Sequence, residues 1–240
     1  MNSPDRGDAP IDVTDPSTWT DEERIGRALL YSGITLTLVV VLWPPLMLLS
    51  QPTGTVEEQL AALAADSALY KLNFFVASLI APVVVVVLML LALFAPAERE
   101  TPLLDVLGVF FLAPYVVLVS IAYTSQYTIL HYLLAEGQMD EATAWLFENT
   151  HSIPYFMNQL GYTFFALAAL LIGYKFLSAS GLPRAIGVLL WASGLLSLVA
   201  FLGLALENEL LNLATFVSGV LIVPVGILVA EWGRRLSRNT

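Results

Sequence analysis

Residues 103–135 read LLDVLGVFFLAPYVVLVSIAYTSQYTILHYLLA, and this stretch decides the class of fold. A helix of this length would measure ~50 Å at ~1.5 Å per residue, whereas the hydrocarbon core of a bilayer is ~30 Å thick. The first half of the stretch is apolar, and the second half carries many polar and aromatic side chains. The stretch therefore predicts a membrane-spanning helix with one polar end.

Polar side chains of that end recur at helical spacing. At ~100° per residue, five of them fall in one wedge about 100° wide. These five are Ser120, Tyr123, Thr124, Tyr127 and His131. Because polar groups within a membrane usually face the bundle interior or a cavity, we expect a binding site first on this face.

The composition is that of a membrane protein. Hydrophobic residues make up 58% of the chain and charged residues 12%, about half the charged fraction of a soluble domain. The net charge of −10 argues against nucleic-acid binding, which needs clustered Lys and Arg. The absence of cysteine excludes disulfides, thiolate metal sites and cysteine nucleophiles.

Apolar runs near the ~20 residues that a crossing requires recur six times. The predicted spans are 27–50, 72–95, 103–131, 157–178, 184–206 and 211–233. They predict an all-α, polytopic bundle of six transmembrane helices in a single domain, residues 25–235. An acidic tail over 1–24, expected to be mobile, precedes this domain, and a short C-terminal tail over 236–240 follows it. No cleavable signal pattern is present at the start, so the first run counts as a span.

Basic residues predict the orientation, because cytoplasmic loops are enriched in Lys and Arg. With six crossings, all basic residues except Lys71 fall on the side of the termini: Arg6, Arg24, Arg27, Arg99, Lys175, Arg184, Arg234, Arg235 and Arg238. Both termini are therefore predicted to be cytoplasmic. The acid-rich, lysine-poor composition suggests a high-salt or high-GC source. We expect a prokaryotic source and a location in the plasma membrane.

The two longer connections then lie outside the cell. The first, residues 51–70, offers Thr55 and Glu58 as a capping box before a short amphipathic run. The second, residues 136–155, predicts a short helix near Asp140. Nine acids face outward and would attract cations or simply form a solvated rim. They are Glu57, Glu58, Asp66, Glu136, Asp140, Glu141, Glu148, Glu207 and Glu209.

Several spans become polar together at this outer end. The candidate ligand-binding residues are Asn73, Tyr123, Thr124, Tyr127, His131, Asn158, Tyr162 and Asn212. They predict either a chamber open to the outside, capped by the two loops, or an interfacial belt of polar and aromatic side chains.

No pattern for catalysis or for a cofactor is present. His131 and His151 lie on the same predicted side, but they lack an HExxH spacing and a third ligand. Nucleophile-elbow, Walker and Rossmann patterns are missing as well. We therefore expect no catalytic residues, no metal and no cofactor.

Residues 160–203 carry one family resemblance. The matching positions are Gly173, Tyr174, Ser180, Gly181, Pro183, Arg184, Gly187, Leu189, Leu190 and Gly194. This pattern resembles the hairpin between the fourth and fifth spans of a bacterial and archaeal membrane family known as domain of unknown function 4386. The resemblance implies fold and membrane location only. From the residues alone, Gly181 is expected to end one helix and Pro183 to start the next.

The sequence leaves three functions open. The first is a non-enzymatic structural, sensory or accessory membrane subunit. The second is a substrate-capturing subunit or small transporter, similar in span number and loop lengths to the vitamin-binding components of energy-coupling-factor transporters. The third is a membrane-embedded enzyme acting on lipid through His131 or His151. The expected partners are the bilayer, a membrane subunit or second copy, and a small molecule at the outer face, with no nucleic acid.

Overall fold

The computed structural model describes residues 20–94 and 102–238, and every regular element in these ranges is an α-helix. The helices are α1 Asp21–Ser50, α2 Val56–Ala65, α3 Ala68–Ser78, α4 Ile80–Leu93, α5 Pro102–Tyr127, α6 Ile129–Ala135, α7 Met139–Thr143, α8 Ile153–Tyr174, α9 Gly181–Ala205, α10 Glu209–Asn212 and α11 Ala214–Leu236. Six continuous or nearly continuous helical segments are long and apolar enough to cross a membrane: Asp21–Ser50, Ala68–Leu93, Pro102–Ala135, Ile153–Tyr174, Gly181–Ala205 and Leu210–Leu236. The chain is thus an all-α polytopic membrane protein, as predicted.

The ends of the helices differ modestly from the predicted spans. α1 begins at Asp21 because the Thr20 side chain accepts from the Glu23 N–H while the Glu23 carboxylate accepts from the Thr20 N–H. Most of the predicted acidic tail, up to residue 19, lies outside the described residues. Gly181 has a positive φ of +64°, but it opens α9 and does not end α8, which stops at Tyr174. The expected role of Gly181 as a helix end is therefore wrong.

Two spans are interrupted within the membrane-length segments. The second span breaks at Leu79, between α3 and α4. Pro82 explains this break, because it has no N–H for the Ser78 carbonyl and its ring clashes with that group. The third span breaks at Thr128, between α5 and α6. Near this break, the hydroxyls of Thr124 and Thr128 donate to the carbonyls of Ser120 and Thr124, respectively, at 2.7 Å each. Such back-bonding often bends helices.

α1 and α11 pack closely where the described chain begins and ends. Gly26 and Gly33 of α1 face Gly226 and Gly233 of α11, so that the two backbones are in contact. A Cβ on Gly33 would lie 2.6 Å from the Ala230 nitrogen and 2.7 Å from the Gly226 oxygen. Only small residues permit such an approach between membrane helices.

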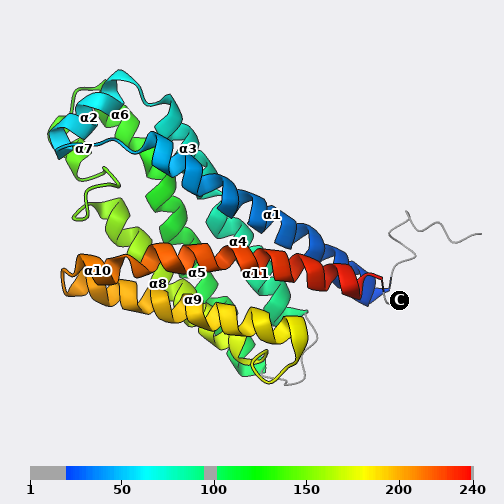
Figure 1. The fold of residues 1–240 in the computed structure, drawn as a ribbon. Helices are drawn as coiled ribbons and strands as arrows, with labels where there is room; N and C mark the ends of the chain where they lie inside the picture. The colour runs from blue at the N-terminus through cyan, green and yellow to red at the C-terminus, as the bar shows by residue number, and fades with distance from the viewer. Residues whose placement is uncertain (1–19, 95–101, 239–240) are drawn as a thin grey trace, which may run out of the picture.

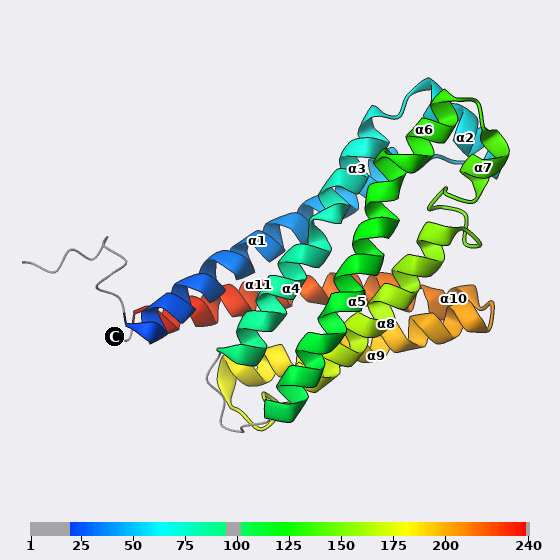
Figure 2. The same ribbon diagram turned by 180° about the vertical axis from the view of Figure 1, so that it is seen from behind.

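The bundle opens toward its opposite end. Figure 1 shows α1 and α11 close together near the termini and well apart where α2, α6, α7 and α10 lie; we call this second end the loop end. Figure 2 shows α5 alongside α8 on the other face. α8 also packs on α9, and α9 packs on α11, which leaves α1, α5, α8 and α11 around the opening.

Buried polar contacts join α9 to α11, and the residue that follows α8 to α4 and α5. The hydroxyls of Ser193 and Ser197 on α9 each lie 2.8 Å from the Ser218 hydroxyl on α11. Lys175, just after α8, is only 4% exposed; its Nζ donates to the Ala92 carbonyl at 2.7 Å and lies 3.3 Å from Asp105 Oδ2. Burial lowers the pKa of Lys175, and the neighbouring Asp105 opposes that shift.

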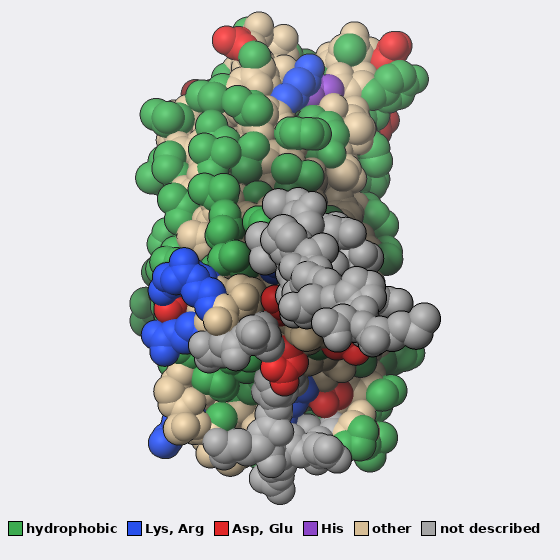
Figure 3. Space-filling model, turned by 90° about the vertical axis from the view of Figure 1, so that its right-hand side faces the viewer, with side chains coloured by type: hydrophobic (Ala, Val, Ile, Leu, Met, Phe, Trp, Pro, Cys, Tyr) green, Lys and Arg blue, Asp and Glu red, His purple; other side chains and the backbone are tan. Residues whose placement is uncertain are grey.

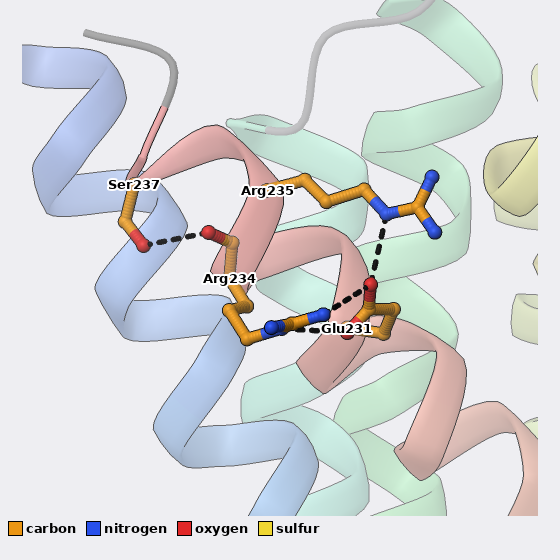
Figure 4. Close-up of polar contacts among 4 residues, drawn as sticks. All are labelled: Glu231, Arg234, Arg235 and Ser237. Carbon is orange, nitrogen blue, oxygen red and sulfur yellow. Dashed lines mark hydrogen bonds and ion pairs between the residues drawn. The ribbon is translucent and has the colours of Figure 1, made fainter.

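The outer surface is suited to lipid. Hydrophobic side chains cover much of the flank in Figure 3, and most Lys and Arg side chains in this view lie in its lower half. At the end of α11, the Glu231 carboxylate accepts from Arg234 at 2.7 Å and from Arg235 at 2.9 Å (Figure 4). These exposed pairs follow the helical i,i+3 and i,i+4 spacing and place the arginines beside the chain terminus.

Candidate ligand-binding cavity

The main cavity lies where α1 and α11 have separated, and it has a volume of about 430 Å³. Residues of α1, α5, α8, α10, α11 and the α7–α8 loop (residues 144–152) line it. Its polar lining consists of Gln51, Tyr123, Thr150, Tyr155, Asn158, Gln159, Tyr162, Asn212 and Thr215. Cavities of this size and mixed lining hold small organic ligands in other proteins.

A side cavity of about 160 Å³ adjoins the main one. Both cavities are lined by Trp43, Met47, Gln51, Phe147 and Tyr155, so they are adjacent, and we call the pair the hollow. The side cavity adds lining residues from α3 and from the loop, namely Asn73, Phe74 and Glu148.

The main cavity owes part of its space to Gly219 on α11. A Cβ built at this residue would have no neighbouring heavy atom within 4 Å, unlike the glycines between α1 and α11. Gly219 also lines a small pocket of about 20 Å³ below the main cavity, together with Tyr115 and Tyr162. The absence of a side chain at Gly219 therefore widens the gap between the helices that line the main cavity.

Four buried polar atoms around the hollow have no hydrogen-bond partner. They are the Trp43 indole nitrogen and the amide oxygens of Asn73, Asn158 and Asn212. Asn73 and Asn158 are only 2% and 4% exposed. An unsatisfied buried polar group costs ~1–3 kcal/mol, so a molecule that bonded to these atoms would recover that free energy.

Gln126, which is fully buried near the end of α5, ties the α7–α8 loop to the bundle. Its amide nitrogen donates to the Trp145 carbonyl at 2.9 Å, and its oxygen accepts from the Phe147 N–H at 3.1 Å. The Tyr70 hydroxyl of α3 also lies 2.9 Å from this oxygen. Gln126 thereby fixes the loop that carries Phe147 and Glu148 over the hollow.

Among the described residues that line the two cavities, Glu148 is the one with a carboxyl side chain. Its Oε2 lies 2.8 Å from the Tyr70 hydroxyl. Burial raises the pKa of Glu148 to about 7, against a smaller lowering by the Tyr70 hydrogen bond. A carboxyl group with this pKa exchanges its proton near neutral pH.

Aromatic rings surround the carboxyl group. The ring of Phe147 lies 5.2 Å from Phe74, 5.7 Å from Tyr123 and 5.9 Å from Tyr155, measured between centroids. These separations are typical of favourable aromatic pairs. The cluster holds the loop against α3, α5 and α8 and presents ring surface to the hollow.

The structure brings together five of the eight candidate residues. Asn73 lines the side cavity, and Tyr123, Asn158, Tyr162 and Asn212 line the main cavity. Gln159 joins α8 to α11 beside them, since its amide oxygen accepts from the Thr215 hydroxyl at 3.0 Å.

Thr124, Tyr127 and His131 lie elsewhere. The Thr124 hydroxyl bonds to the Ser120 carbonyl of its own helix, and the Tyr127 hydroxyl lies 3.4 Å from Ser78 Oγ on α3. His131 stands on α6, beyond the break at Thr128, so the wedge drawn on one continuous helix does not form. His151 lines a different cavity, of about 360 Å³. Within the described ranges, no group of three His, Asp or Glu side chains is placed to hold a metal ion.

Sequence reasoning missed the lining from α1 and from the loop. Trp43, Met47 and Gln51 recur every four residues on one face of the first span, a signal that hydropathy hides. The sequence pattern distinguishes Glu148 in no way from the other eight acids that are predicted to face outward. Glu148 lies in the hollow, unlike the other acids that the structure describes, because of contacts that involve Tyr70 and Gln126, and these residues are distant from it in the sequence.

Fold and hollow together define a class: a six-span helical membrane protein with a cavity at its loop end that is lined by aromatic, aliphatic and amide side chains. Residues 30–233 match the family described as Domain of unknown function (DUF4386), and the chain belongs to that family. The resemblance drawn from residues 160–203 is thereby confirmed. The chain matches no curated protein and no solved structure.

Proposed function

We propose that this protein is a non-enzymatic membrane subunit that captures a small amphipathic molecule. The observation that carries this proposal is the set of four unpaired buried polar atoms around one hollow. Unpaired groups of this kind are costly in a closed core, and a bound ligand would satisfy them. Capture rather than chemistry is favoured because neither histidine lines the main cavity.

The lining indicates the size and polarity of the ligand. Rings and aliphatic side chains such as Trp43, Phe147, Tyr162 and Phe216 suit an apolar body, and the amides suit hydroxyl, amide or amine groups. Neither Lys nor Arg is among the described lining residues of the two cavities, so an anion has no counter-charge there.

We propose that the loop end faces the outside of a prokaryotic cell, in the plasma membrane. The arginines at the end of α11 support this orientation, since cytoplasmic ends are enriched in basic residues. The ligand then reaches the hollow from the outer aqueous phase or the outer leaflet. A partner subunit or a second copy of the chain would carry the signal or the transport step.

Thermal unfolding of the purified protein with a ligand panel tests this function. The panel contains small amphipathic molecules in neutral, cationic and anionic classes. We expect neutral or cationic members to raise the Tm, since a ligand at 100 times its Kd stabilises by ~2.7 kcal/mol. The proposal is wrong if no member of the panel raises the Tm.

A cavity-filled variant makes the test specific. Gly219→Leu places a side chain in the open space of the main cavity, where its Cβ meets no heavy atom within 4 Å. The variant should fold and lose the ligand-induced shift. Val220→Leu, at an exposed neighbouring position on α11, is the control and should keep it. A shift that persists in Gly219→Leu would move the binding site elsewhere.

A further inference from the structure

Tyr70, Gln126 and Glu148 form a hydrogen-bond chain that reaches the side cavity at Glu148. In this chain, the single hydroxyl proton of Tyr70 faces two acceptor oxygens. The Tyr70 hydroxyl lies within hydrogen-bond distance of two acceptors, Gln126 Oε1 at 2.9 Å and Glu148 Oε2 at 2.8 Å. The Gln126 amide is oriented by the Trp145 carbonyl and the Phe147 N–H, so its oxygen faces Tyr70. A tyrosine hydroxyl has one proton and can donate to only one of these oxygens at a time.

A protonated Glu148 resolves this balance. The carboxyl then donates to the Tyr70 oxygen, and Tyr70 donates to Gln126, so that each oxygen contact contains one proton. When Glu148 is ionised, the Tyr70 proton turns to the carboxylate and the Gln126 oxygen keeps only the Phe147 N–H. The chain therefore has two states that differ by one proton on Glu148.

No cation among the described lining residues compensates an ionised Glu148. The elements around it contribute Trp43, Met47 and Gln51 from α1, Asn73 from α3 and Tyr155 from α8. Tyr70 and Tyr155 are the titratable neighbours in this lining and contact set, and a tyrosine side chain cannot carry a positive charge. A half-buried carboxylate among apolar side chains is unfavourable without a positive partner, and a cationic ligand would supply that partner.

The same walls are suited to an organic cation. The rings of Trp43, Phe74, Phe147 and Tyr155 line the side cavity together with Glu148. Aromatic faces attract ammonium groups, and desolvated contacts of this kind are worth ~2 kcal/mol. The unpaired amide oxygen of Asn73, a residue that is 2% exposed, is a further acceptor for an ammonium N–H.

We propose that the side cavity is an amine subsite, in which a protonated amine with an apolar body binds in exchange for the proton of Glu148. The ammonium pairs with the Glu148 carboxylate and the Asn73 oxygen, the apolar body extends into the main cavity, and the displaced proton leaves to water. This inference deepens the proposed function and rests on it. It adds the charge class of the ligand and a coupling to pH.

Three matched probes separate the inference from the proposed function. 2-Phenylethylamine, 2-phenylethanol and phenylacetate share one skeleton and carry a positive, a neutral and a negative charge near pH 7. Isothermal titration of the purified full chain should give the order amine, alcohol, acid at pH 8. Because the pKa of Glu148 is about 7, amine affinity should fall about tenfold between pH 8 and pH 6, while alcohol affinity stays constant.

Proton release provides a second readout. At pH 6, titration of the amine in two buffers of different ionisation enthalpy should show close to one proton released per amine bound, and at pH 8 close to none. Glu148→Gln keeps the side-chain shape and should abolish both the release and the pH dependence. Glu141→Gln, an exposed acid on α7, should change neither.

The outcomes are distinguishable. Alcohol that binds to the parent protein and is lost in Gly219→Leu supports the proposed function by itself. If that result comes with an amine that binds no tighter than the alcohol at pH 8, or with amine binding that is independent of pH, the amine subsite is refuted and the capture function stands. If none of the three probes binds, the amine subsite is refuted as well.

Discussion

Two glycine-to-alanine substitutions at mid-helix positions should have opposite effects on stability. Gly219 on α11 and Gly33 on α1 have the same local conformation, so intrinsic helix propensity favours alanine at both by ~0.8–1.0 kcal/mol. Their surroundings differ. The Cβ at Gly219 would meet nothing within 4 Å, whereas the Cβ at Gly33 would lie 2.6 Å from the Ala230 nitrogen.

The expected magnitudes follow from these distances. Gly219→Ala should raise the free energy of unfolding by about 1 kcal/mol, because the propensity gain is unopposed. In Gly33→Ala the obstructing atoms are backbone atoms of α11, so relief requires the two helices to move apart. Overpacking of this kind costs ~1–3 kcal/mol, which exceeds the propensity gain.

Reversible unfolding in mixed micelles, followed by circular dichroism, measures both variants under one condition. We expect Gly219→Ala to unfold at a higher denaturant fraction than the parent and Gly33→Ala at a lower one. Gly219→Ala at or below the parent would mean that the main cavity is not open space. Gly33→Ala at or above the parent would mean that α1 and α11 do not touch as described.

Four further substitutions test the remaining contacts. Gln126→Leu should destabilise the protein by ~2–4 kcal/mol and speed proteolysis in the α7–α8 loop, because several buried partners lose their bonds; unchanged cleavage kinetics would contradict this. Lys175→Met should cost ~3–5 kcal/mol, and adding Asp105→Asn should recover part of it, in denaturation of single and double variants; strictly additive losses would argue against a coupled pair. Because burial raises the pKa of Glu148 to about 7, the contribution of Glu148 to stability is full below its usual pKa of 4.5 and is lost as pH rises through about 7. The Tm of the parent should therefore fall relative to that of Glu148→Gln over this range, and parallel Tm curves would disprove the assignment. The chain has no native cysteine, so Ser237→Cys should react with an impermeant maleimide only after cells are opened. Labelling of intact cells would show that the orientation is opposite to the one proposed.

The sequence by itself determined the elements that depend on local chemistry. Apolar runs of bilayer length identified the six spans, because every backbone polar group in lipid must be satisfied within its own helix. The capping box predicted at Thr55–Glu58 is present, and a second one of the same spacing forms at Thr20–Glu23, since both partners lie within one turn. The short helix near Asp140 is α7, and the family followed from one hairpin.

Only the tertiary structure decided which polar side chains meet. The break at Thr128 separates His131 from Tyr123, although the two share a helical face in the sequence. Tyr70, Gln126 and Glu148 are brought together from positions 56 and 78 residues apart. The cavity itself arises because α1 and α11 touch through glycines at one end and diverge at the other. Local sequence encodes helices through neighbours within a turn, whereas a cavity is set by the paths of several helices, and those paths depend on contacts distant along the chain.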